Sequence, residues 1–190
     1  MSVKRCNWLS DDPAYIAYHD EEWGVPLHEE QRLFEFLILE TFQTGLSWIT
    51  ILHKRANFRL AFDKFDYKKV ALYDEDKVAA LLVDVGIVRN RLKVRSAISN
   101  AQAFMEVQKE FGSFDKYIWG FVGGKPLQNN FSSMSDVPPK TELAELLSKD
   151  LKKRGFRFVG PTVIYAYMQA TGMVNDHTID CFRYKEVQED

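Results

Sequence analysis

The chain has 190 residues, of which 46% are hydrophobic and 27% charged, a balance that is typical of globular proteins and excludes a largely disordered chain. The formal net charge of -2 excludes a highly basic nucleic-acid coat protein, but it is compatible with DNA binding through one local basic patch. No apolar stretch is long enough to span a membrane, and residues 1–12 lack the apolar core of a signal peptide, so we expect a cytoplasmic protein.

The first predicted helix covers residues 29–39, where apolar side chains recur at helical spacing. Glu40 follows directly, and Gly45 then interrupts the pattern. Ser47 is placed to cap a second helix that begins at Trp48. A carboxylate at the end of such an apolar run is expected to be half-buried, and buried carboxylates are usually paired or functional.

Further helices are expected in the middle of the chain. Asp74 is placed to cap a helix that runs through Val83, residues 90–111 form a long helix, and Ser113 opens a short one. The side chains of the long helix that we expect to face inward are Leu92, Ala97, Ile98, Ala101 and Phe104. Residues 122–139 are rich in glycine, proline, serine and asparagine, which indicates a lobe boundary or a flexible loop.

Two helices are predicted near the C-terminus. One begins at Thr141 and continues to about Arg154, and the other begins at Pro161 and continues to Gly172. Alternating strand patterns are scarce along the whole chain, and no internal repeat is visible. The sequence therefore predicts an all-α fold.

Both cysteines and two of the four histidines lie near the chain ends, as Cys6, His19, His177 and Cys181. Two thiolates and two imidazoles form a complete tetrahedral zinc set, which would staple the two ends and leave no open coordination position. The spacing is not that of a compact zinc finger, so buried core cysteines and a disulfide remain alternatives to a structural zinc ion.

A glycine-containing hairpin joins the two C-terminal helices at residues 152–162. Gly155, Gly160 and Thr162 would let backbone N–H groups at a helix start approach a DNA phosphate, as in a helix-hairpin-helix. The basic side chains of this segment would add Coulombic attraction to the DNA backbone. The alternative interpretation is an ordinary glycine-broken turn between two amphipathic helices.

Six ordered segments together resemble one family, the type I 3-methyladenine DNA glycosylases. The segments are Cys6 to Trp8, Tyr15 to Asp20, Glu22 to Pro26, Gly45 to Thr50, Lys152 to Phe156 and Val174 to His177. With the zinc set they extend from residue 6 to residue 181, nearly the whole chain.

The resemblance implies a single DNA glycosylase domain over residues 1–190, with two helical lobes flanking a base-binding cleft and a helix-hairpin-helix. It implies that a structural zinc ion held by the Cys/His set joins the N- and C-terminal segments. It also implies that Glu40 is the catalytic residue. The substrate-binding residues would be Tyr15, Tyr18, Trp48, Trp8 and Trp23.

One position departs from the wider superfamily of helix-hairpin-helix glycosylases. Many members place a catalytic aspartate two residues before the histidine that corresponds to His177, and here that position is Asn175. Asp176 is adjacent but out of register. The type I family characteristically lacks this aspartate, so the departure supports the narrower assignment and argues against activity on neutral lesions.

The implied chemistry suits the residue types. Adenine methylated at N3 is cationic while it is attached to the sugar, and aromatic faces attract such a cation. Glu40 would accept a hydrogen bond from the exocyclic amine. The base leaves as a neutral molecule, so no acid is needed to protonate it, and the group that positions the water stays unassigned. The alternative is that the aromatic residues simply pack in the core.

The expected partners are alkylated double-stranded DNA and free 3-methyladenine as product, with a monomeric protein. A non-catalytic DNA-binding module would share the hairpin, but it would not need an aromatic pocket around Glu40. A zinc hydrolase with Glu40 as general base would need an open metal site, which a complete Cys/His set does not provide.

Overall fold

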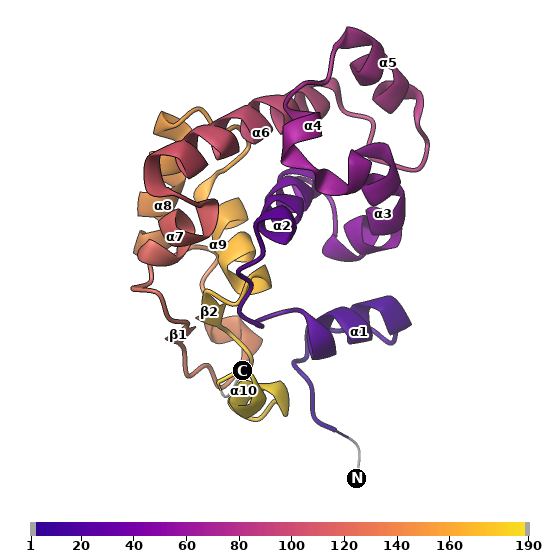
Figure 1. The fold of residues 1–190 in the computed structure, drawn as a ribbon. Helices are drawn as coiled ribbons and strands as arrows, with labels where there is room; N and C mark the ends of the chain where they lie inside the picture. Colours follow the sequence, from indigo (N-terminus) through magenta and orange to yellow (C-terminus); the bar gives the residue numbers. More distant parts are fainter. Residues whose placement is uncertain (1–2, 189–190) are drawn as a thin grey trace.

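Helices account for nearly all of the regular structure in residues 3–188, the part of the chain that the computed structural model describes (Figure 1). In chain order the longer helices are α1 (Pro13–Glu21), α2 (Glu30–Gln43), α3 (Trp48–Ala61), α5 (Glu75–Val83), α6 (Arg91–Phe111), α7 (Phe114–Gly120), α8 (Glu142–Lys153) and α9 (Pro161–Ala170). Shorter helical segments are η1 (Asp63–Phe65), α4 (Tyr67–Val70), η2 (Met134–Asp136) and α10 (Arg183–Glu186). The prediction of a mostly helical fold is confirmed.

A short parallel pair of strands is the exception to the helical pattern. β1 (Leu127–Gln128) pairs with β2 (Val174–Asn175). β1 lies within the segment 122–139, for which the sequence predicted irregular structure, and β2 directly precedes Asp176 and His177. The pairing therefore fastens this largely irregular segment to the chain that carries one half of the Cys/His set.

Side-chain caps begin several helices where the sequence predicted them. Asp74 at the start of α5, Ser113 at the start of α7 and Thr141 at the start of α8 each accept a hydrogen bond from a backbone N–H of the first turn. Such bonds satisfy donors that have no partner within the helix. Ser47 differs: it precedes α3 as expected, but its hydroxyl bonds Thr50 Oγ1 at 2.7 Å and caps no backbone group.

One prediction about α6 is wrong. Leu92 was expected to face inward, but 68% of this residue is exposed. The buried stripe of α6 includes Val94, Ala97, Ala101 and Phe104, which recur at intervals of three and four residues. Leu92 is only two residues from Val94, so it lies on another side of the helix. Ile98 packs at the edge of the core and is partly buried.

The central element of the fold is α2, which extends past its predicted end at residue 39 to Gln43. Every residue from Leu33 to Phe42 is buried, so this helix is enclosed by protein on all sides. Figure 1 shows α2 in the middle of the molecule, and α3, α6 and α9 contact it. The extension places Glu40 inside the helix rather than beyond its end.

The chain after α1 passes closely over the end of α9, and Gly172 permits that approach. Gly172 has φ +69°, and a Cβ built there would lie 2.3 Å from the carbonyl carbon of Val25. Only glycine adopts this left-handed backbone conformation readily and also has no Cβ, for which there is no room here. Next to it, Gly24 N donates to Gln169 O at 3.0 Å, and this contact holds the segment beside Trp23 against α9.

Among the described residues, no helix combines the length and the apolar character needed to cross a membrane.

Candidate active site and metal centre

A pocket of about 200 Å³ opens between α1, α2, α3 and α9. All six side chains that the sequence analysis assigned to a pocket line it: Trp8, Tyr15, Tyr18, Trp23, Glu40 and Trp48. Four further residues line it as well: Gln43, Met134, Ala166 and Gln169. The structure thus brings together residues from both ends of the chain and from its middle.

Aromatic rings form most of the pocket wall. The ring centroids of Tyr18 and Trp48 lie 5.4 Å apart, those of Trp8 and Tyr15 4.9 Å apart, and those of Trp8 and Trp23 5.1 Å apart. All three pairs are tilted or edge-on, which is the favourable arrangement for aromatic pairs. Their flat faces can enclose a planar ring.

Glu40 is the buried carboxylate of the pocket, with 3% of the residue exposed. Among residues 3–188, no donor bonds its Oε2 atom. Burial raises the pKa of Glu40 to about 8, because the protein interior solvates a carboxylate poorly. A buried acceptor without a hydrogen-bond donor lowers the stability of the folded protein, unless a ligand supplies the donor.

Two indole groups in the same pocket are also unsatisfied. Trp8 Nε1 and Trp48 Nε1 are buried and have no hydrogen-bond partner in the described part of the chain. The pocket therefore combines one unpaired acceptor with two unpaired donors inside an aromatic wall. This pattern fits a flat ring with both donor and acceptor groups at its edge.

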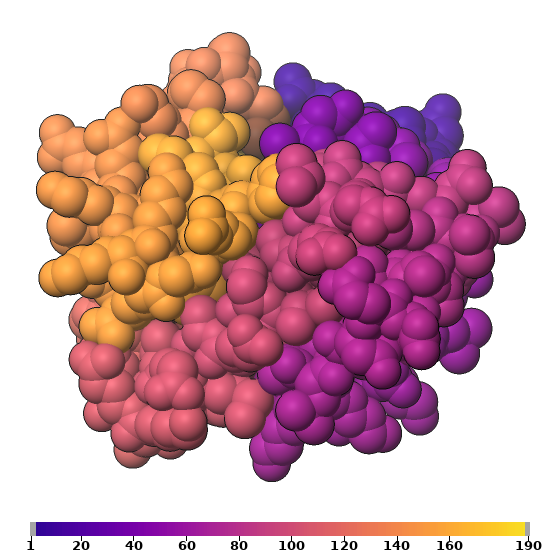
Figure 2. Space-filling model, turned by 90° about the horizontal axis from the view of Figure 1, so that it is seen from above, coloured from indigo at the N-terminus to yellow at the C-terminus, as the bar shows by residue number. Residues whose placement is uncertain are grey.

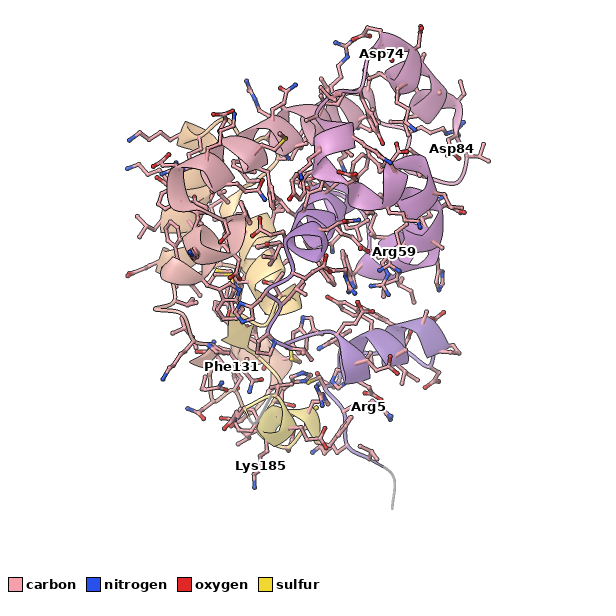
Figure 3. The ribbon with its side chains drawn as sticks, viewed as in Figure 1. Arg5, Arg59, Asp74, Asp84, Phe131 and Lys185 are labelled. Carbon is pink, nitrogen blue, oxygen red and sulfur yellow. The ribbon has the colours of Figure 1, made fainter. Side chains whose placement is uncertain are left out.

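Charged side chains hold α1 against the helices that carry the rest of the pocket. Arg55 on α3 donates to both oxygens of Glu22 at the end of α1, at 2.8 Å and 2.6 Å. Arg32 on α2 donates to the same carboxylate at 2.9 Å. Arg59, labelled on α3 in Figure 3, donates to buried Glu35 of α2 at 2.8 Å. This network sets the spacing between the walls.

Some of the pocket residues that the sequence analysis missed had a usable signal. Gln43 lies three residues after Glu40 on the same helix, and Ala166 and Gln169 are three residues apart on α9. Helical spacing would have placed each on a pocket-facing side once one neighbour was known. Met134 comes from the irregular segment 122–139, where no periodic pattern could indicate its direction.

The second cluster joins the two ends of the chain. Cys6, His19, His177 and Cys181 are all buried, and one ligand atom from each lies within 4.8 Å of the others. Both cysteines are free. The pKa of Cys181 is held well below its usual range, because the Cys6 thiol makes a hydrogen bond to its sulfur.

Outer hydrogen bonds orient both imidazoles of this cluster. His19 Nδ1 bonds Asp20 at 2.8 Å, and His177 Nε2 bonds the carbonyl of Trp23 at 2.9 Å. In each ring this outer bond fixes which nitrogen carries the proton, and the other nitrogen lies 3.5 Å from the sulfur of Cys181. His19 Nε2 also accepts a hydrogen bond from the backbone N–H of Cys6 at 3.4 Å. Arg5 in turn holds Asp20 through three contacts of 2.7 to 3.0 Å, and Figure 3 shows Arg5 near α1. The donor set fits a tetrahedral metal ion.

The predicted hairpin lies between α8 and α9. Gly155 follows α8 with φ +96°, and Gly160 precedes α9 without any side-chain cap bond. Thr162, in the first turn of α9, is exposed. Asn100 of α6 braces the connecting loop, since its side chain bonds both the N–H and the carbonyl of Arg157. The hairpin does not line the pocket.

Asn175, at the position of the superfamily aspartate, also lies outside the pocket lining. Its amide donates to Gln128 Oε1 at 2.8 Å and to the carbonyl of Tyr184 at 3.0 Å, and its oxygen accepts from His177 N at 3.3 Å. All of these bonds tie neighbouring segments together. Asn175 is a structural residue here.

The fold and the pocket define a helical protein with a buried, unpaired carboxylate inside an aromatic pocket. A family model described as methyladenine glycosylase matches residues 8–184. The chain is 47% identical over 182 residues to DNA-3-methyladenine glycosylase 1 of Escherichia coli, covering 96% of this chain and 97% of that relative. The chain belongs to the methyladenine glycosylase family.

Solved structures agree with this assignment. A crystal structure of 3-methyladenine DNA glycosylase I matches with a TM-score of 0.92 and 47% identity, covering 94% of this chain and 98% of that one. A Staphylococcus aureus 3-methyladenine DNA glycosylase I, solved to explain its recognition of 3-methyladenine, matches with a TM-score of 0.92 and 36% identity, covering 96% and 97% of the two chains.

Proposed function

We propose that the protein hydrolyses the N-glycosidic bond of 3-methyladenine in alkylated double-stranded DNA. The observation that carries this proposal is the unpaired carboxylate of Glu40 inside an aromatic pocket. The relatives in the family are DNA-3-methyladenine glycosylases, and they match nearly the whole chain. A target base must leave the helix to reach such a pocket, because a base inside the duplex is stacked on both sides.

Charge distinguishes the damaged base from normal adenine. The methylated base is cationic while it is attached to the sugar, so the faces of Tyr15, Tyr18 and Trp48 attract it. A cation in the pocket also favours the ionised form of Glu40, whose pKa is otherwise raised to about 8 by burial. Neutral adenine gains neither interaction. It would give up its contacts with water on entering the pocket and gain no charge-dependent attraction in return.

Glu40 is the proposed catalytic residue because it touches the departing base. Its free oxygen accepts a hydrogen bond from the exocyclic amine. The electron pair of the bond between base and sugar leaves with the cationic base, which becomes neutral 3-methyladenine, and water adds to the sugar. Trp8 and Trp23 complete the wall beside Tyr15 and would keep water away from the ring.

The hairpin is the proposed contact with the DNA backbone. We assign Gly155, Gly160 and Thr162 to a helix-hairpin-helix, in which N–H groups at the start of α9 bind a phosphate. Lys152 and Lys153 are exposed next to it and add positive charge. In Figure 2 the yellow-orange surface of this region meets the pink surface of α6.

A structural zinc ion is the proposed occupant of the Cys/His cluster, held by Cys6, His19, His177 and Cys181. The ion would neutralise two thiolates and join the N- and C-terminal segments, and four protein ligands would leave no position for a reacting water. The buried cluster and the oriented imidazoles support this assignment over the zinc hydrolase alternative.

We further propose one glycosylase domain over residues 1–190, with two helical lobes on either side of the pocket, acting as a monomer in the cytoplasm. Two buried free thiols suit a reducing compartment.

The test is base release from methylated duplex DNA, followed by chromatography of the freed bases. The purified protein should release 3-methyladenine, and Glu40→Gln should release it at least about a hundredfold more slowly. A folded protein that binds duplex DNA but frees no base would instead be a non-catalytic binding module.

A further inference from the structure

Asp176 is a buried junction behind the pocket, with 1% of the residue exposed. Its Oδ2 atom accepts hydrogen bonds from Tyr165 Oη at 2.6 Å and from Gln169 Nε2 at 2.7 Å. Its Oδ1 atom accepts from Asn129 Nδ2 at 2.7 Å. Of these three donors, only Gln169 lines the pocket. Asp176 itself does not line it.

These bonds determine which way the Gln169 amide points. A carboxylate only accepts hydrogen bonds, so the NH₂ group of Gln169 must face Asp176, and the carbonyl must face away from it. Among residues 3–188, no donor bonds Gln169 Oε1. Donation to a carboxylate also increases the negative charge on the amide oxygen, because the amide group is polarised along its length.

We propose that Gln169 is a specificity-determining residue, whose carbonyl Oε1 accepts a hydrogen bond from the exocyclic amine of the bound purine, and that Asp176 is the residue that positions it. This inference depends on the proposed function, which supplies the purine. It assigns to the pocket a second acceptor besides Glu40.

Four polar atoms of the pocket complement the groups of an adenine edge. Trp8 Nε1 and Trp48 Nε1 are unpaired donors, and an adenine ring offers lone pairs on its ring nitrogens. Glu40 Oε2 and Gln169 Oε1 are unpaired acceptors, and the exocyclic amine offers two N–H groups. A purine with a carbonyl in place of the amine would place its oxygen against the acceptor oxygens of Glu40 and Gln169, and these would repel each other. A site built to bind an N–H group strongly rejects such an analogue.

The experiment compares binding of two free bases, 3-methyladenine and 3-methylhypoxanthine, by titration calorimetry. Gln169→Met keeps the length of the side chain and removes the carbonyl. We expect its affinity for 3-methyladenine to fall about tenfold, as for the loss of one hydrogen bond in a buried site, and its affinity for 3-methylhypoxanthine not to fall.

Three variants test the role of Asp176. Asp176→Ala removes the acceptor that orients Gln169. It should therefore lose as much of the preference for 3-methyladenine over 3-methylhypoxanthine as Gln169→Met does. The double variant should lose no more of this preference than either single variant. Asp176→Asn keeps a carbonyl oxygen and should retain the discrimination. Tyr165→Phe removes a different bond to the same carboxylate and serves as the matched control, with both affinities unchanged.

Several outcomes would overturn the inference. Parallel loss of both affinities in Gln169→Met would mean that Gln169 only packs against the base. Unchanged affinities with slower base release would mean that it positions water instead. If Asp176→Ala does not fold, Gln169→Met decides alone. Wild-type protein that neither binds nor releases 3-methyladenine would refute the proposed function as well, whereas normal wild-type release with unaltered discrimination in Gln169→Met would refute this inference only.

Discussion

Cys6 lies directly against His177, although 171 residues separate them in the chain: the sulfur of Cys6 is 3.5 Å from Nδ1 of the imidazole. Cys181 Sγ approaches the same nitrogen at 3.5 Å. His177 also packs edge-on against Trp23 of the pocket, with ring centroids 4.6 Å apart. The cluster that joins the two chain ends is therefore in direct contact with the pocket wall through His177 and Trp23.

Removal of the metal should destabilise the whole protein. Without an ion, two buried sulfurs and two imidazoles would lack their proposed partner, and the N-terminal segment would lose its main tie to the C-terminal one. We expect the purified protein to contain one zinc ion by elemental analysis. We expect Cys181→Ser to lose it, with the melting temperature lowered by more than about 10 °C.

Thr178→Ala is the control for that experiment, since the Thr178 hydroxyl bonds the sulfur of Cys6 at 3.8 Å but does not belong to the set of four. It should keep the ion. Protein that melts at the same temperature with and without a strong chelator would contradict a structural role for zinc.

Burial of Glu40 should make the protein less stable as the pH rises. The folded-state pKa of about 8 lies above the ordinary value of 4.5, so between these pH values the folded protein holds a proton that the unfolded chain has released. The free energy of unfolding should therefore decrease through this window by up to about 1.4 kcal/mol per pH unit. Chemical denaturation of wild-type protein and Glu40→Gln at several pH values isolates this contribution.

Glu40→Gln should match the wild type in stability near pH 4 and exceed it at pH 8, since the amide does not ionise. A stability difference between the two proteins that is constant over the range would show that Glu40 is paired in solution. Adding 3-methyladenine should reduce the difference in the free energy of unfolding between the two proteins at high pH, because the ligand donates a hydrogen bond to the ionised carboxylate of Glu40.

The indole N–H of Trp48 should matter for ligand binding more than for folding. Its Nε1 is buried without a partner, so Trp48→Phe removes an unsatisfied donor while it keeps an aromatic face against Tyr18. We expect the melting temperature to change by only a few degrees and the affinity for free 3-methyladenine to fall about tenfold. Calorimetric titration measures the affinity. Trp119→Phe is the control, because Trp119 Nε1 already bonds the carbonyl of Leu27 and lies outside the pocket.

Lys152 and Lys153 should contribute to DNA affinity without affecting the pocket. Both are exposed at the end of α8, next to the hairpin. Replacing each with alanine should weaken binding to duplex DNA and lower the slope of log affinity against log salt concentration by about one per residue. Fluorescence anisotropy over a salt series measures this slope. Affinity for free 3-methyladenine should stay unchanged, and an unchanged salt slope would place the DNA contact elsewhere.

Local sequence patterns predicted most of the helices correctly. The caps at Asp74, Ser113 and Thr141 and the apolar spacing in α2 and α6 depend on neighbours within a few residues, so they can be read without knowing the fold. The same patterns failed for Leu92, because the contacts of a first turn depend on which helix lies beside it. The extension of α2 through Glu40 was missed for a similar reason, as that segment is stabilised by burial on all sides rather than by local spacing.

The sequence by itself determined the helical character, which depends on short-range order, and its resemblance to a known family singled out the Cys/His set and the carboxylate of Glu40. Only the tertiary structure decided that Trp8 and Trp48 have no partner for their N–H groups among the described residues, that Gly172 must accommodate the chain at Val25, and that Asp176 binds the amide nitrogen of Gln169. These facts depend on distances between residues far apart in the chain, and such distances are set by packing of the whole molecule.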